Sequence, residues 1–132
     1  MIDAYFGFIE KTILDFKAII NSISIQKKAY NDMQGFIKGE IVFNDLSKLC
    51  FTEVNNTELY EKIKYRYHYM NKENNLIFRY DNAYHHSEVG SFPNHKHLGE
   101  RIVKSHEPGL HEILLEIQKC IREELNTVCA KH

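Results

Sequence analysis

The sequence lacks the features that mark secreted, disulfide-rich and membrane proteins. Its three cysteines, Cys50, Cys120 and Cys129, are odd in number and widely spaced, without a C-x-x-C pair. Such a set argues against a disulfide framework and favours a reducing compartment. No apolar run approaches the ~20 residues of a membrane-spanning helix, and the acidic start MIDAYFGFIEK is unlike a signal peptide. We therefore expect a cytoplasmic protein with no membrane segment.

The sequence also lacks an excess of charge of either sign. Its formal net charge is −1 with neutral histidines. The overall charge therefore does not indicate nucleic-acid binding, and any anion site must be local. Repeats, low-complexity segments, interdomain linkers and Gly-rich phosphate loops are absent from the sequence. With 132 residues, 43% of them hydrophobic, the chain is long enough for one domain, residues 1–132, with a real core.

The spacing of apolar residues predicts an α+β fold. A helical stripe covers residues 3 to about 20, and a second one covers about 109–126. Between them the period changes to two, which predicts strands over residues 22–29, 36–43, 48–54, 59–70 and 76–81. Short polar turns separate these strands. We therefore expect an N-terminal helix, an antiparallel meander of four or five strands, and a C-terminal helix packed on the sheet.

The cleanest alternation in the sequence lies in residues 59–70, LYEKIKYRYHYM. One strand face carries Ile63, Tyr65, Tyr67 and Tyr69, and the other carries Lys62, Lys64, Arg66 and His68. A basic face interleaved with tyrosines is typical of a sheet surface that contacts RNA, and it makes Arg66 and Lys64 candidate phosphate ligands. A solvated outer face is the alternative. Glu53, a lone carboxylate in an apolar strand, is expected to point outward or toward the histidines described next.

Chemistry-bearing side chains gather in residues 76–97, LIFRYDNAYHHSEVGSFPNHKH. Four of the eight histidines of the chain fall here within thirteen residues: His85, His86, His95 and His97. They are accompanied by Arg79, Tyr80, Asp81 and Lys96. Histidine is the side chain whose ordinary pKa lies closest to neutrality, so such a cluster indicates proton transfer or metal binding.

The first interpretation of this stretch is RNA cleavage without a metal. Attack by the ribose 2′-hydroxyl needs a general base, a general acid, and cations on the phosphate. Two of the four histidines would supply the base and the acid, and Arg79 and Lys96 would contact the phosphate. Tyr80 would stack on a base or donate a hydrogen bond, and Asp81 would orient an imidazole. No cofactor is expected in this interpretation.

Other interpretations of the same residues stay open at this point. His95 and His97 form an H-x-H pair that, with Asp81 and His85 or His86, could ligate zinc or another divalent ion. The stretch could also belong to a module that binds a ribosomal or protein surface without catalysis, or be a polar loop with no function. Assembly as a homodimer is also compatible with the sequence.

Two motifs, RYDNAYHH (residues 79–86) and SFPNHKH (residues 91–97), make the chain resemble the TumE-type family of type II toxin–antitoxin systems. Tyr84 stands where the family has proline, and Asn94 where it usually has histidine. The resemblance implies a toxin that blocks growth by cleaving RNA or stopping translation, restrained by a cognate antitoxin protein. The order helix, meander, helix is also similar to RelE-like ribonucleases, an analogy of fold alone.

Overall fold

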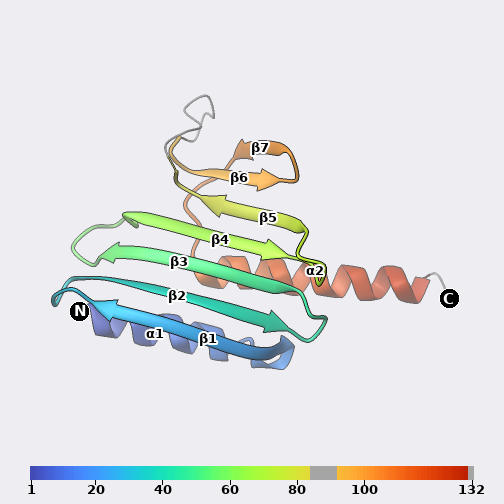
Figure 1. The fold of residues 1–132 in the computed structure, drawn as a ribbon, viewed down its shortest axis with the longest axis horizontal. Helices are drawn as coiled ribbons and strands as arrows, with labels where there is room; N and C mark the ends of the chain where they lie inside the picture. Colours follow the sequence, from blue (N-terminus) through green and yellow to red (C-terminus); the bar gives the residue numbers. More distant parts are fainter. Residues whose placement is uncertain (84–91, 131–132) are drawn as a thin grey trace.

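The structure, a computed structural model, describes residues 1–83 and 92–130, with side chains up to residue 123. In these residues the chain forms two α-helices, one 3-10 helix and one sheet of seven antiparallel strands in sequence order (Figure 1). The elements are α1 (Ile2–Leu14), η1 (Lys17–Ile19), β1 (Ile20–Ala29), β2 (Gln34–Phe43), β3 (Lys48–Asn56), β4 (Lys64–Met70), β5 (Leu76–Asp81), β6 (His95–Leu98), β7 (Arg101–Lys104) and α2 (Leu110–Ala130). The predicted α+β class is confirmed.

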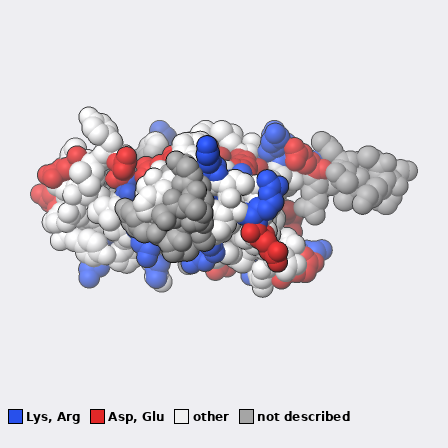
Figure 2. All heavy atoms as spheres, turned by 90° about the horizontal axis from the view of Figure 1, so that it is seen from above, with Lys and Arg blue, Asp and Glu red and all other residues white. Residues whose placement is uncertain are grey.

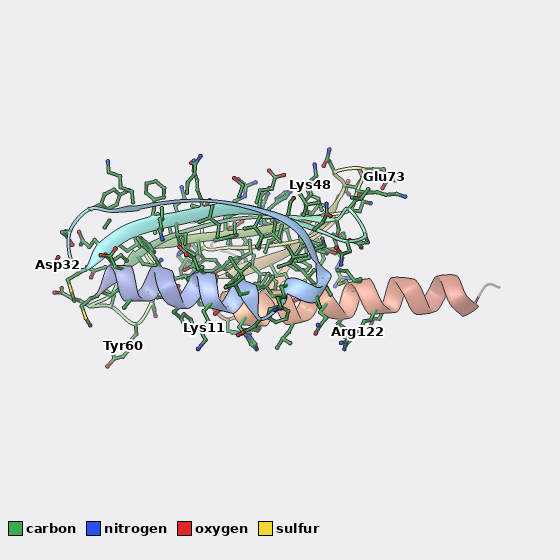
Figure 3. All side chains as sticks on the ribbon, turned by 90° about the horizontal axis from the view of Figure 1, so that it is seen from below. Lys11, Asp32, Lys48, Tyr60, Glu73 and Arg122 are labelled. Atoms are coloured by element: carbon green, nitrogen blue, oxygen red, sulfur yellow. The ribbon has the colours of Figure 1, made fainter. Side chains whose placement is uncertain are left out.

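Both α-helices lie on the same side of the sheet, and we call that side the helix face and the opposite side the outer face (Figures 1 and 3). The alternation of β4 explains the arrangement. Tyr65, Tyr67 and Tyr69 are at most 1% exposed on the helix face, whereas Lys64 and Arg66 are exposed on the outer face. The buried stripes of α1 and α2 pack on this apolar side: Ile2, Phe6, Ile9, Ile13, Ile113, Leu114 and Ile117.

The number of strands differs from the expected four or five. All five predicted strands are present, and the described residues add β6 and β7 from the stretch that was expected to be a loop. The sequence HKHL of β6 is too short and too polar for a hydrophobic alternation, because histidines occupy its buried positions. Gly99, with a φ of +61°, makes the turn to β7 in the left-handed region that glycine adopts without a Cβ clash.

Element ends also differ from the predicted ranges. The first helix ends at Leu14, and a 3-10 turn leads into β1. Strand β4 begins at Lys64 and not at residue 59, because Leu59 donates its backbone N–H to Asn56 and Lys62 donates its own to the carboxylate of Glu107. The second helix runs from residue 110 to 130. Neither described helix combines the length and apolar composition needed to cross a membrane.

Glu53 is fully buried on the helix face, away from the histidines, so both expectations for its direction are wrong. Its carboxylate accepts hydrogen bonds from the hydroxyls of Tyr5 and Tyr67 and from the amide of Asn55. A buried carboxylate requires such partners. Because Tyr5 lies on α1 and Tyr67 on β4, Glu53 ties the first helix to the middle of the sheet.

Candidate active site

The register between β5 and β6 sorts the predicted site residues onto the two faces of the sheet. Arg79 lies opposite His97, Tyr80 opposite Lys96, and Asp81 opposite His95. Directly opposed residues share a face, and successive residues alternate. Arg79, Asp81, His95 and His97 therefore lie together on the outer face, and we call these four the β5–β6 cluster. Tyr80 and Lys96 lie on the helix face.

The carboxylate of Asp81 is the centre of the β5–β6 cluster. Its Oδ1 lies 2.6 Å from Nε2 of His95, and its Oδ2 lies 3.4 Å from Nε2 of His97. Arg79 donates from Nε to the same Oδ2 at 3.0 Å. The contact with His95 is an ion pair when the imidazole is protonated. One carboxylate thus contacts two imidazoles and one guanidinium.

Two further contacts orient the imidazoles. Nδ1 of His95 lies 3.0 Å from the carbonyl oxygen of Pro93, which can only accept, so this nitrogen donates and Nε2 is the one that faces Asp81. Nη2 of Arg79 lies 3.0 Å from Nε2 of His97. A guanidinium can only donate, so this contact is a hydrogen bond in the tautomer that leaves Nε2 of His97 without a proton. In that tautomer Nε2 is the ring nitrogen that can take up a proton.

Burial ranks the four side chains by their access to a ligand. The side chain of His95 is 0% exposed and that of Asp81 is 9% exposed, compared with 10% for His97 and 23% for Arg79. Arg79 and His97 are therefore the members closest to solvent, and Asp81 and His95 lie beneath them. A hollow of about 260 Å³ adjoins the cluster, lined by Lys64, Tyr65, Arg66, Arg79, Asp81, Asn82 and Ala83. Its cationic lining suits a phosphate.

The cluster also has the donor set of a metal site. One ligand atom each from Asp81, His95 and His97 can be chosen so that all lie within 4.8 Å of one another. Two imidazoles and one carboxylate suit zinc or iron. Arg79 opposes a cation at this position, however, because its guanidinium contacts both Asp81 and His97. It already supplies the positive charge that the carboxylate needs.

Tyr80 and Lys96 contact the second helix and not the cluster. The hydroxyl of Tyr80 donates to Oε1 of Glu116 at 2.6 Å, and Nζ of Lys96 donates to Oε2 at 2.9 Å. Burial, and next the bond to Glu116, raise the pKa of Tyr80 above its ordinary value. These two residues, predicted as substrate contacts, lie where they attach α2 to β5 and β6. Sequence patterns gave no signal for Glu116 as their partner.

The other predicted residues divide in a similar way. Lys64 and Arg66 lie on the outer face and line the hollow beside the cluster, as expected for phosphate ligands. The tyrosines of β4 are buried on the helix face, so they offer no stacking surface next to these cations. Lys62 precedes the strand and donates to the carbonyl oxygen of Pro108. His85 and His86 lie outside the described residues.

Comparison with known proteins gives one match. The family described as "Toxin TumE" matches residues 9–125 of the chain. No curated protein and no solved structure matches, so the analogy with RelE-like ribonucleases stays a prediction. The matched segment spans most of the 132 residues and contains the whole β5–β6 cluster. On this evidence the chain belongs to the TumE toxin family.

Proposed function

We propose that this toxin arrests growth by cleaving RNA at the β5–β6 cluster, without a metal ion, and that a cognate antitoxin protein restrains it. The observation that carries the proposal is the contact of Asp81 with His95, His97 and Arg79 on an outer face that also presents Lys64 and Arg66. Proton-transfer groups and phosphate-binding cations are the two components that RNA cleavage requires.

The reaction needs a base for the 2′-hydroxyl and an acid for the leaving 5′-oxygen. The 2′-hydroxyl loses its proton, its oxygen attacks the adjacent phosphorus, and the bond from phosphorus to the 5′-oxygen breaks as that oxygen is protonated. The products are a 2′,3′-cyclic phosphate and a 5′-hydroxyl. Water is not consumed in this step, and no electron carrier is required.

His97 is the best base among the described residues. Its Nε2 is the basic nitrogen in the tautomer that accepts from Arg79, and its side chain is more exposed than that of His95. Asp81 would stabilise the imidazolium that forms when His97 takes up the proton. The fully buried His95 would position Asp81. The acid would come from His85 or His86, two of the four histidines predicted for proton transfer.

Arg79 and the cations of β4 would stabilise the charge that builds on the phosphate. Arg79 has the largest exposed fraction in the cluster and presents a guanidinium, which binds phosphate oxygens in pairs. Lys64 and Arg66, on the same hollow, would contact the neighbouring phosphates. Tyr80 and Lys96 have no catalytic role in this proposal, because they are bonded to Glu116.

A direct experiment uses induced expression of the wild-type chain and of His97→Ala, followed by mapping of RNA 3′ ends. We expect growth arrest with 2′,3′-cyclic phosphate ends for the wild type, and a loss of cleavage of at least about 100-fold for the variant, the size of a general acid or base contribution. Full cleavage by a variant in which His85, His86, His95 and His97 are all alanine would overturn the proposal. Growth arrest without cleaved RNA would instead indicate an inhibitor that acts by binding.

A metal-dependent nuclease is the second candidate, because Asp81, His95 and His97 have the geometry of a three-ligand site. In that case a metal would activate the attacking group and carry charge on the phosphate. The purified toxin treated with EDTA separates the two candidates. Unchanged cleavage supports the histidine mechanism, and cleavage that is lost and then restored by zinc or manganese supports the metal.

A further inference from the structure

The outer face of the sheet is open across several strands. Both helices pack on the helix face, and no described helix covers the other side (Figure 3). Lys48 projects from the outer face in this view, whereas Lys11 and Arg122 project from the side of the helices. A sheet that presents one face to solvent leaves its strand side chains free for a partner.

The strands of the outer face carry mostly positive charge. Strand register and the alternation of side chains place seven cationic residues on the outer face: Lys28, Lys38, Lys48, Lys64, Arg66, Arg79 and Lys104. The carboxylates that the described strands place there are Glu40 and Asp81. The whole chain has a net charge of −1, so the excess is local. In the view onto the β7 edge, several Lys and Arg side chains project along the side away from the helices (Figure 2).

Several cations of the outer face have no partner within the described part of the chain and are available to bind an anionic ligand. Within the described part of the chain, Lys38, Lys64 and Arg66 form no ion pair and no side-chain hydrogen bond. On the helix side, lysines pair with glutamates: Lys27 with Glu10, Lys62 with Glu107 and Lys96 with Glu116. Unneutralised cations on one face are what a phosphate backbone requires.

One row of side chains leads across the strands to the cluster. Lys38 lies opposite Thr52, which lies opposite Arg66, which in turn lies opposite Asp81. Neighbouring strands are about 4.8 Å apart, so the row from β2 to β5 spans ~14 Å. A strand of nucleic acid lying along this row would cross β3 and β4 and reach the β5–β6 cluster.

An aromatic platform lies near the start of the row. Tyr30 is 55% exposed, and its ring centroid lies 6.0 Å from that of Phe36, which shares the outer face with Lys28. Farther along β2, residues of β1, β2 and β3 line a hollow of about 300 Å³, and Lys38 and Glu40 are among them. Cations combined with an accessible aromatic ring are typical of surfaces that bind single strands, because a ring stacks on an unpaired base.

We infer that the outer face binds single-stranded RNA along the row from Lys38 to Arg66, with an unpaired base stacked on Tyr30. The last step, delivery of a phosphodiester to the β5–β6 cluster, rests on the proposed function. An acidic segment of the antitoxin would satisfy the cations equally well, but it would not need the exposed ring. The aromatic requirement favours RNA.

The test is a binding measurement that does not depend on cleavage. A fluorescent 2′-O-methyl RNA of about 12 nucleotides, within the usual size range of single-strand sites, cannot undergo attack by a 2′-hydroxyl. Its Kd for the full chain is measured by anisotropy for Lys38→Glu and Tyr30→Ser. We expect Kd to rise about tenfold or more for the lost phosphate contact and about fivefold or more for the lost stacking.

Matched controls lie on the side of the helices. Lys11→Glu makes the same charge change, and Tyr60→Ser removes a tyrosine ring that is fully exposed, compared with 55% for Tyr30; both residues are labelled there in Figure 3. We expect these controls to bind as the wild type does. With Lys38→Ala, the dependence of log K on log salt should flatten by about 0.7, the slope of one phosphate on a single strand.

The outcomes separate this inference from the proposed function. Lost RNA binding by Lys38→Glu and Tyr30→Ser supports the inference even when the wild type cleaves no RNA. Equal binding by these variants and their controls overturns it, even when the wild type cleaves RNA at the cluster. Loss of antitoxin binding by Lys38→Glu, with unchanged RNA binding, overturns it in favour of an acidic protein segment.

Discussion

Strands β5 and β6 place residues of similar chemistry on opposite faces, where they have different partners. Arg79 on the outer face contacts Asp81 and His97 beside an accessible hollow. Lys96, one register position away on the neighbouring strand, lies on the helix face and pairs with Glu116. Both are cations in the same histidine-rich stretch. In the proposed function only Arg79 contacts the substrate.

The comparison shows that closeness in sequence does not define a site in a strand. A shift of one residue exchanges the two faces, because side chains alternate. Tyr80 and Lys96 thus contribute to the packing of α2, and their neighbours form the β5–β6 cluster. The functional contribution of residues 76–97 should therefore alternate along each strand, and this expectation can be tested directly.

Replacement of Arg79 should have the largest effect. Arg79→Ala removes the donor to Asp81 and His97 and the guanidinium proposed to bind the phosphate. We expect the RNA cleavage rate to fall by about 100-fold or more, the cost of one preorganised donor to the transition state. Arg79→Lys should recover only part of the rate, because an ammonium cannot donate in the paired geometry. Cleavage rates of purified variants measure both effects.

Lys96→Ala is the matched control on the helix face. Its loss should cost at most about 1 kcal/mol of stability, as for a half-exposed ion pair, and leave the cleavage rate nearly unchanged. Equal losses of cleavage for Arg79→Ala and Lys96→Ala would contradict the difference between the two faces. In that case the active site would include the helix side of β6.

Sequence patterns predicted the fold class but could not assign the residues of β5 and β6 to the two faces of the sheet. The apolar periodicities of the helices and of β4 were strong, and they predicted the fold class and five of the strands. Strand β6 was missed, because His95 and His97 occupy its buried positions where apolar residues would be expected. Without β6 there was no register to separate Lys96 from the histidines. The family motif covers residues of both faces and does not separate them.

Two glutamates provide the next comparison, at the level of stability. Glu53 is fully buried on the helix face and accepts from Tyr5 and Tyr67, whereas Glu40 is exposed on the outer face. Glu53→Ala leaves two hydroxyls without their acceptor, at about 1–3 kcal/mol each. We expect a loss of about 3 kcal/mol or more in the free energy of unfolding, measured in urea.

Glu40→Ala should change the free energy of unfolding by about 0.5 kcal/mol or less, as for most surface substitutions. Similar losses for the two variants would show that the Glu53 network does not stabilise the attachment of α1. The sequence could not distinguish the two residues, since each is a single carboxylate within a strand of alternating pattern. Burial and the distant partner Tyr5 become visible only when α1 is placed on the sheet.

The smallest expected effect concerns His68, a histidine of the outer face outside the cluster. Burial, and then the positive charges of Arg66 and Arg79, lower the pKa of His68 in the folded chain below its ordinary value. Its Nδ1 is buried and finds no hydrogen-bond partner among the described residues. As the pH falls through about 6.5, the ordinary value, the unfolded chain therefore binds more protons than the folded one, and stability decreases.

His68→Gln removes this contribution, so the Tm of the variant should fall less than that of the wild type between about pH 7.5 and pH 5.5. A larger fall for the variant would mean that protonated His68 is stabilised by a partner on the outer face, contrary to its position beside two arginines.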